Sequence, residues 1–182
     1  MAFTVEVAID ETFETEAAID KVFAVLADVP FSVSHFPKVD KLIDEGDGVY
    51  RTEMQKIGIQ SYYIQTVYAA KYVADAGKAT VTWTPVKGVG NATVSGKWQL
   101  KDLGGDGTRV KFHTKAQLDM PFPRMAKMVL GGFVRGEFET MVEQYLDNLE
   151  ETFAKGKLPP KKKAAAKKKT AAKKKPAAKK KA

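Results

Sequence analysis

The stretch PRMAKMVLGGFVRGEFETMVEQYLDNLEETFA, residues 123–154, decides the fold that this sequence predicts. Its apolar side chains, from Met125 and Val129 to Leu149 and Phe153, recur every three or four residues, as they do along one face of an α-helix. A helix of this length is the one predicted element large enough to cover the apolar face of a sheet. The rest of the fold is therefore expected to form around it.

The residues before this helix predict an antiparallel sheet of about seven strands. In residues 3–13, Phe3, Val5 and Val7 alternate with polar side chains, which is the pattern of a half-buried strand. Further strands are predicted over residues 39–46, 49–58, 61–75, 78–86, 91–103 and 108–120. Short links join these strands, and short links require antiparallel pairing.

Two short helices are predicted between the first and second strands. Thr15 is placed as the N-cap of the first, which spans residues 15–29, and Pro30 stops it. The second begins at Pro30 and ends before Pro37. The expected class is α+β of the helix-grip kind: a strand, two short helices, a run of further strands and a long C-terminal helix.

The C-terminal end of the chain differs in composition from the rest. The 182 residues include 30 Lys and Arg against 22 Asp and Glu, a net charge of +8. Residues 161–182 hold twelve of those lysines and no acid, so the remaining 18 bases and 22 acids leave the rest of the chain near −4. The sequence thus predicts a folded domain over residues 1–158 and a disordered lysine-rich tail over residues 159–182.

The tail is expected to bind DNA or RNA. Lysines that neutralise phosphates release counterions, which gives salt-sensitive binding without sequence preference. The repeat is similar to the lysine-rich tails of linker histones. The alternatives are a tail that only aids solubility, or one that contacts anionic lipid or polyphosphate. The lysines expected to contact nucleic acid are Lys161, Lys162, Lys163, Lys167, Lys168, Lys169, Lys173, Lys174, Lys175, Lys179, Lys180 and Lys181.

Several kinds of site are not expected. The chain has no cysteine, and neither of its two histidines has a neighbour at a metal-ligand spacing, so no metal site is predicted. His113 is expected to face solvent and His35 to pack near the two short helices, so no residue is assigned a catalytic role. No cofactor is expected, because no glycine-rich phosphate loop occurs in the right setting. Without a signal peptide or a long apolar run, a cytoplasmic protein is expected, with the nucleoid as a further location.

Three stretches resemble the SRPBCC superfamily, the helix-grip fold shared by START lipid-transfer domains and polyketide cyclase-like proteins. They are ETEAAIDKVFAVLADV (residues 14–29), HFPKV (residues 35–39) and GDGTRVKF (residues 105–112). The chain departs from the pattern at His35 and Phe36, where many members have a tryptophan. The resemblance implies a cavity between the sheet and the long helix, opening near the two short helices and the first half of the long helix, that takes a hydrophobic ligand.

Aromatic, methionine and isoleucine side chains are expected to line such a cavity: Met54, Tyr62, Ile64, Tyr68, Trp83, Trp98, Phe112, Met128, Met141 and Tyr145. The alternative is that these side chains fill a solid core. The leading functional hypothesis is a non-enzymatic protein that binds a hydrophobic small molecule, a lipid or a protein partner and is tethered to nucleic acid by its tail. An enzyme of the polyketide cyclase/aromatase kind, using tyrosine hydroxyls, and a lipid carrier docked on an anionic membrane are the alternatives.

Overall fold

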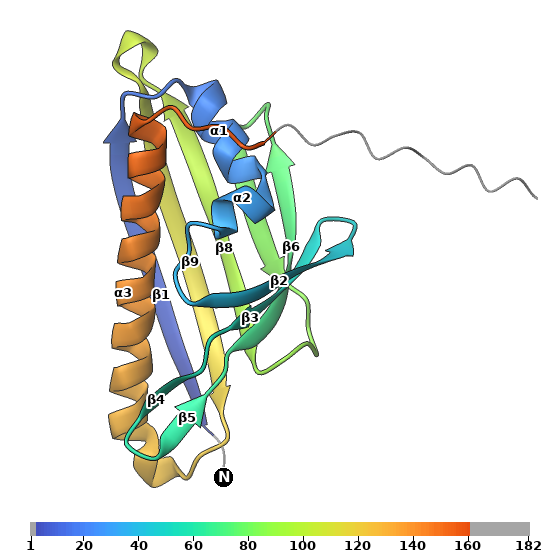
Figure 1. Ribbon diagram of the computed structural model, residues 1–182, viewed down its shortest axis with the longest axis vertical. Helices are drawn as coiled ribbons and strands as arrows, with labels where there is room; N and C mark the ends of the chain where they lie inside the picture. Colours follow the sequence, from blue (N-terminus) through green and yellow to red (C-terminus); the bar gives the residue numbers. More distant parts are fainter. Residues whose placement is uncertain (1–2, 161–182) are drawn as a thin grey trace, which may run out of the picture.

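One large antiparallel sheet lies along a long C-terminal helix, with two short helices at one end of the pair (Figure 1). The computed structural model describes residues 3–160. The element order and the antiparallel pairing agree with the sequence pattern. The predicted α+β helix-grip fold is therefore confirmed.

The large sheet has seven strands, in the order β1-β9-β8-β7-β6-β3-β2. Their bounds are β1 Phe3–Thr15, β2 Val39–Gly46, β3 Val49–Met54, β6 Val67–Asp75, β7 Thr80–Pro85, β8 Ala92–Asp102 and β9 Thr108–Met120. A separate hairpin pairs β4 Ile57–Ile59 with β5 Tyr62–Ile64. The helices are α1 Ile19–Ala27, α2 Val29–Val33 and α3 Lys127–Ala154, with 3-10 turns η1 Gly104–Asp106 and η2 Arg124–Ala126.

Helix α3 is held against the sheet near both of its ends. In its C-terminal half, Val142, Leu149 and Phe153 are buried in a core that includes side chains of α1 and of β7, β8 and β9. Near its start, Leu130 and Val134 are buried with side chains of β1 and β9. Each fully buried aliphatic side chain contributes roughly 1.5–3 kcal/mol, so these two groups fix the position of the helix on the sheet.

Two of the predicted strands are interrupted. The segment 49–58 leaves the large sheet after Met54, and the segment 61–75 is divided between β5 and β6. At this point the backbone N–H of Met54 donates to the carbonyl oxygen of Thr66 at 2.9 Å. The residues between them form the β4–β5 hairpin, which turns at Gln60 with a φ of 56°. Alternation of side chains could not reveal this break, because the pattern continues through both segments.

The predicted N-cap of the first helix is wrong. Thr15 is the last residue of β1, where it pairs with Thr108 of β9, and α1 begins at Ile19. Pairing with β9 therefore keeps Thr15 in the strand. Helix α1 already ends at Ala27, and Pro30 lies in the first turn of α2, where its missing N–H breaks no helical hydrogen bond.

Trp83 and the backbone of β9 lie so close to Gly96 that one added methyl group there is predicted to destabilise the fold. A Cβ atom on Gly96 of β8 would lie 2.2 Å from Cζ2 of Trp83 and 2.4 Å from the carbonyl oxygen of His113. Gly96→Ala is therefore expected to lower the free energy of unfolding by about 1–3 kcal/mol, as overpacking does. Urea unfolding measures the change. Gly105→Ala is the control, because nothing lies within 4 Å of its Cβ position; equal effects of the two substitutions would contradict the prediction.

Candidate ligand cavity

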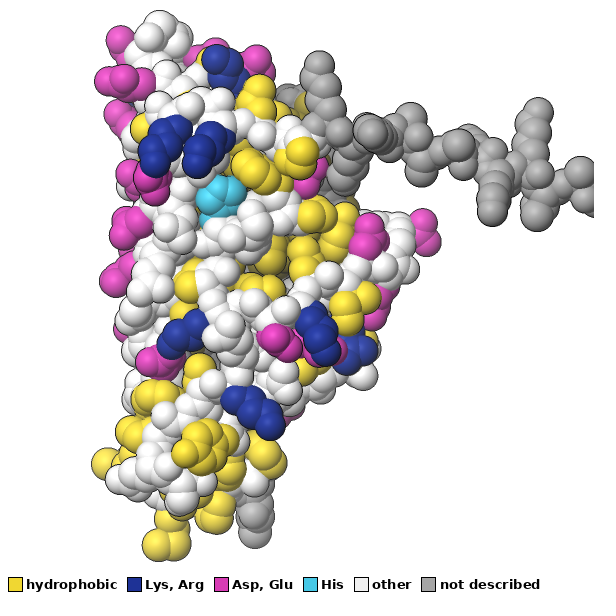
Figure 2. All heavy atoms as spheres, viewed as in Figure 1, with side chains coloured by type: hydrophobic (Ala, Val, Ile, Leu, Met, Phe, Trp, Pro, Cys, Tyr) yellow, Lys and Arg dark blue, Asp and Glu magenta, His cyan; other side chains and the backbone are white. Residues whose placement is uncertain are grey.

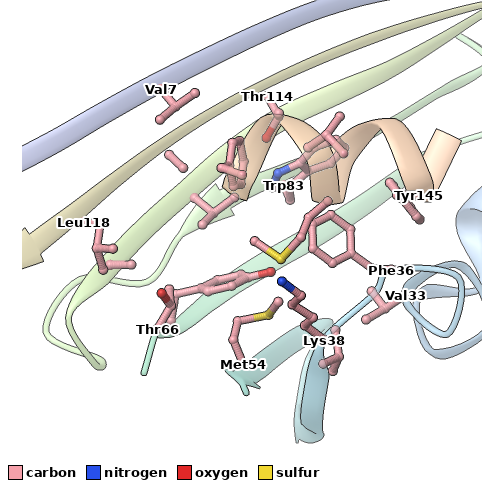
Figure 3. Close-up of a pocket in the computed structure, with 18 of the residues that line it drawn as sticks. Val7, Val33, Phe36, Lys38, Met54, Thr66, Trp83, Thr114, Leu118 and Tyr145 are labelled. Atoms are coloured by element: carbon pink, nitrogen blue, oxygen red, sulfur yellow. The ribbon is translucent and has the colours of Figure 1, made fainter. Parts of the chain in front are cut away.

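The space between the large sheet, α3 and the two short helices is hollow (Figure 3). The volume of this cavity is about 120 Å³. An apolar cavity of roughly 150 Å³ is large enough to bind benzene, so the space is of the order that takes a small apolar group. Figure 2 shows an apolar hollow on this face of the molecule, between α2 and the β2–β3 hairpin.

Aromatic rings from four different elements form one wall of the cavity. They are Trp83 on β7, Trp98 on β8, Phe112 on β9 and Tyr145 on α3. The ring centroids of Trp98 and Phe112 are 4.4 Å apart, and those of Trp98 and Tyr145 are 6.0 Å apart. Contacts between aromatic rings add about 0.5–1.5 kcal/mol each beyond burial. This wall therefore ties α3 to three strands and keeps the cavity's shape.

The cavity contains few polar groups, and its tyrosine hydroxyls are uncharged. The hydroxyls of Ser32 and Tyr145 share a buried hydrogen bond of 2.7 Å. Burial raises the pKa of Tyr68 and of Tyr145, and it raises the pKa of Tyr72 well above its usual value of 10.0. All three phenols are thus neutral at physiological pH. The other polar lining residues without charge are Gln55, Thr66, Thr114 and Gln117.

The structure brings together most of the side chains that the sequence placed in the cavity. Those that line it are Met54, Tyr68, Trp83, Trp98, Phe112, Met141 and Tyr145. Tyr62 and Ile64 instead line a second, smaller pocket beside the start of α3, because the β4–β5 hairpin turns away from the large sheet. Met128 is 90% exposed, because Leu130 and Val134 occupy the inward face of α3.

The two histidines lie outside the cavity lining. Nδ1 of His35 donates to a carbonyl oxygen of α2 at 2.8 Å, and its Nε2 is 2.8 Å from the hydroxyl of Thr152 on α3. The side-chain amide of Asn148 donates to the carbonyl oxygen of His35 at 2.9 Å. His35 therefore links α2 to α3. His113, on β9, is exposed as predicted and lies 2.7 Å from a carboxylate oxygen of Asp10.

Other kinds of site can be assessed over residues 3–160. Within this range, no group of three or more His, Cys, Asp or Glu side chains could hold a metal ion. The same range contains no helix that is long and apolar enough to cross a membrane. Residues 161–182, with the twelve lysines expected to bind nucleic acid, lie outside the described residues.

The sequence reasoning missed Phe36, Lys38 and Gln55 as cavity residues. The ring of Phe36 packs against Tyr145 with centroids 5.1 Å apart. Phe36 and Lys38 both belong to the HFPKV stretch, which follows the short helix expected near the mouth, so its position was an available signal. Gln55 carried no such signal, since it was placed inside a continuous strand.

The sequence matches the model of a known protein family. The family model for polyketide cyclase/dehydrase and lipid transport proteins matches residues 6–154. The chain belongs to this family. The match runs from β1 to the end of α3 and so includes every element that lines the cavity. A comparison with curated proteins finds no match.

Solved structures share the same fold at low sequence identity. A START superfamily protein from Mycobacterium smegmatis is 13% identical, with a TM-score of 0.59 and coverage of 81% of this chain and 97% of that one. An aromatase/cyclase from a Streptomyces species is 16% identical, with a TM-score of 0.53 and coverage of 83% and 93%. Norcoclaurine synthase from Thalictrum flavum is 17% identical, with a TM-score of 0.54 and coverage of 86% and 91%. At these identities the likeness establishes the fold alone.

The buried tyrosines predict how stability changes at alkaline pH. Burial raises the pKa of Tyr68, Tyr72 and Tyr145 in the folded protein, so the unfolded chain loses these protons first as the pH rises above about 10. Their contribution to stability is complete below that pH and is lost as the pH climbs toward the raised values. Tyrosinate absorbance and circular dichroism, followed in one titration, should show these phenols ionising together with unfolding. Ionisation of all six tyrosines in a chain that keeps its native dichroism would disprove this expectation.

Proposed function

We propose that this protein binds a hydrophobic small molecule in the cavity and releases it unchanged. The observation that carries the proposal is the hollow, mainly apolar interior, held open between α3 and the sheet by a wall of packed aromatic rings. Concave apolar spaces with a few polar groups are the usual form of small-molecule sites. Membership of a family whose description includes lipid transport supports the same function.

An enzyme of the polyketide cyclase/aromatase kind is the second candidate, favoured by the tyrosine hydroxyls at the cavity. Such an enzyme needs a positioned acid or base. Tyr68 lines the cavity, but Tyr62 lies in the smaller pocket, and none of the described lining residues is a carboxylate. The hydroxyl of Tyr145 is already hydrogen-bonded to Ser32. These observations favour binding over reaction.

We further propose that the lysine-rich tail binds nucleic acid without sequence preference and so tethers the folded domain to it. The protein would then lie in the cytoplasm, at the nucleoid. The support is the distribution of charge along the chain: twelve lysines and no acid in residues 161–182, against a net charge near −4 for the rest. A domain with that charge is repelled by phosphates, so the tail must supply the attraction to nucleic acid. The end of α3 at Ala154 supports a division between domain and tail at about Leu158. A lipid carrier on an anionic membrane is the competing use of the same tail.

Filling the cavity should weaken binding of an apolar molecule. Met141 on α3 lines the cavity, and Met141→Trp is expected to weaken binding of the neutral fluorophore N-phenylnaphthylamine by at least about 10-fold, the equivalent of roughly 1.4 kcal/mol. Met125→Trp is the matched control, because Met125 is 95% exposed. Fluorescence titration measures both. The proposal fails if the unaltered protein does not bind the fluorophore, or if Met141→Trp binds it as tightly.

Removing the tail should abolish retention on DNA. The full chain is expected to bind a random-sequence duplex with a log–log salt slope of roughly −5 to −11, corresponding to about half to all of the twelve lysines. A chain that ends at Leu158 should lose this binding and keep the native dichroism and fluorophore binding. Titration with salt measures the slope for both chains. Persistent DNA binding by the shortened chain, or binding of the full chain to anionic vesicles in preference to the duplex, would refute the nucleic-acid tether.

A further inference from the structure

The cavity has one charged lining residue among those that the structure describes, and it is Lys38. Lys38 lies in the connection between α2 and β2, at the mouth. Figure 3 shows its side chain extending into the same space as Met54 and Phe36, with the ammonium nitrogen at the inner end. A single cation beside an otherwise neutral, apolar interior is a specific chemical feature, because lysine side chains seldom line such space.

The backbone at Lys38 is fixed in an uncommon conformation. Its φ is 58°, in the left-handed region that residues other than glycine rarely adopt. The carbonyl oxygen of Lys38 accepts a hydrogen bond of 2.8 Å from the backbone N–H of Gln55, another lining residue. The surrounding structure thus holds the start of the lysine side chain at the mouth, even at a local conformational cost.

The ammonium of Lys38 is paired with a carboxylate that does not line the cavity. Nζ of Lys38 lies 2.5 Å from Oε2 of Glu137 on α3, and the two side chains are 41% and 27% exposed. Ion pairs at this level of exposure contribute little net free energy, because water solvates both partners when they separate. The flexible lysine stem can therefore exchange Glu137 for another anion without moving the backbone.

We propose that the cavity takes an amphiphile whose apolar body fills the interior and whose terminal carboxylate binds Lys38 at the mouth, replacing Glu137. This inference rests on the proposed function, since it names the class of molecule that the cavity binds. The sign of the head group follows from Lys38, the charged residue among the described lining residues, whereas its partner Glu137 is not one of them; the arriving head group is therefore an anion. A neutral head group would leave the Lys38–Glu137 pair as it is and gain no charge-assisted hydrogen bond.

The test compares two molecules that share a decyl chain, decanoate and decanol, by displacement of N-phenylnaphthylamine from the full-length protein. The unaltered protein is expected to bind decanoate roughly 10-fold more tightly than decanol. Lys38→Gln should remove this preference. Glu137→Gln should tighten decanoate binding, because it removes the competing carboxylate while Lys38 stays in place. Lys41→Gln is the matched control, since Lys41 also pairs with a glutamate but does not line the cavity.

The outcomes separate this inference from the proposed function. If decanol and the fluorophore bind but decanoate binds no more tightly than decanol, the assignment of the head group is wrong and the hydrophobic cavity stands. A preference for decanoate that survives in Lys38→Gln, or weaker decanoate binding in Glu137→Gln, also overturns the assignment. If neither molecule nor the fluorophore binds the unaltered protein, both the proposed function and this inference are wrong.

Discussion

The contact between α3 and the sheet is the constraint on which the rest of the structure depends. The helix is about 42 Å long at 1.5 Å per residue, and it is held near both of its ends by buried aliphatic and aromatic side chains. Between these two anchor regions, Phe138 and Met141 line the cavity. Protein interiors are normally packed without such voids. The interior stays hollow because α3 packs against the sheet near both of its ends and because the aromatic wall ties it to the strands.

The order of the elements could be predicted because it follows from local patterns. Alternation along β8 and β9 places Trp98 and Phe112 on one face, and the spacing along residues 123–154 indicates one long helix. The hydrogen bond from Met54, the last residue of β3, to Thr66 joins two segments, and the pairing of Thr15 with Thr108 joins two strands that are far apart in the sequence. Neither contact can be recognised from the sequence around the residues that form it.

The residues that line the cavity were harder to predict than the fold, because they too depend on contacts between segments that are distant in the sequence. At the start of α3 the apolar side chains surround the helix, so the spacing alone could not tell the outward Met128 from the inward Leu130. Lys38 shows the opposite case. A lysine in a connection is ordinarily a solvated surface residue, and only the left-handed backbone and the position of Gln55 bring it to the mouth.

The outer face of the sheet carries several acidic and basic side chains in pairs, whereas the cavity has the single charge of Lys38 among its described lining residues. Three pairs of acidic and basic side chains link β1 to β9: Arg109 with Glu14, His113 with Asp10, and Lys115 with Glu6. All are exposed, so each stabilises the fold little. Because opposite charges across a strand pair disfavour slipped alignments, their combined effect is on the register of the longest strand pair in the sheet.

The two sides of the cavity mouth are built with unequal stiffness. Helix α2 and the turn after it are fastened to α3 by hydrogen bonds between Ser32 and Tyr145, His35 and Thr152, and Asn148 and His35. The facing side is β2, an edge strand that pairs with β3 alone and has two irregularities in its register. Backbone that is exposed and paired on one side opens at the lowest free energy. A molecule bound in the proposed site would therefore meet a fixed side at α2 and a more easily opened side at β2.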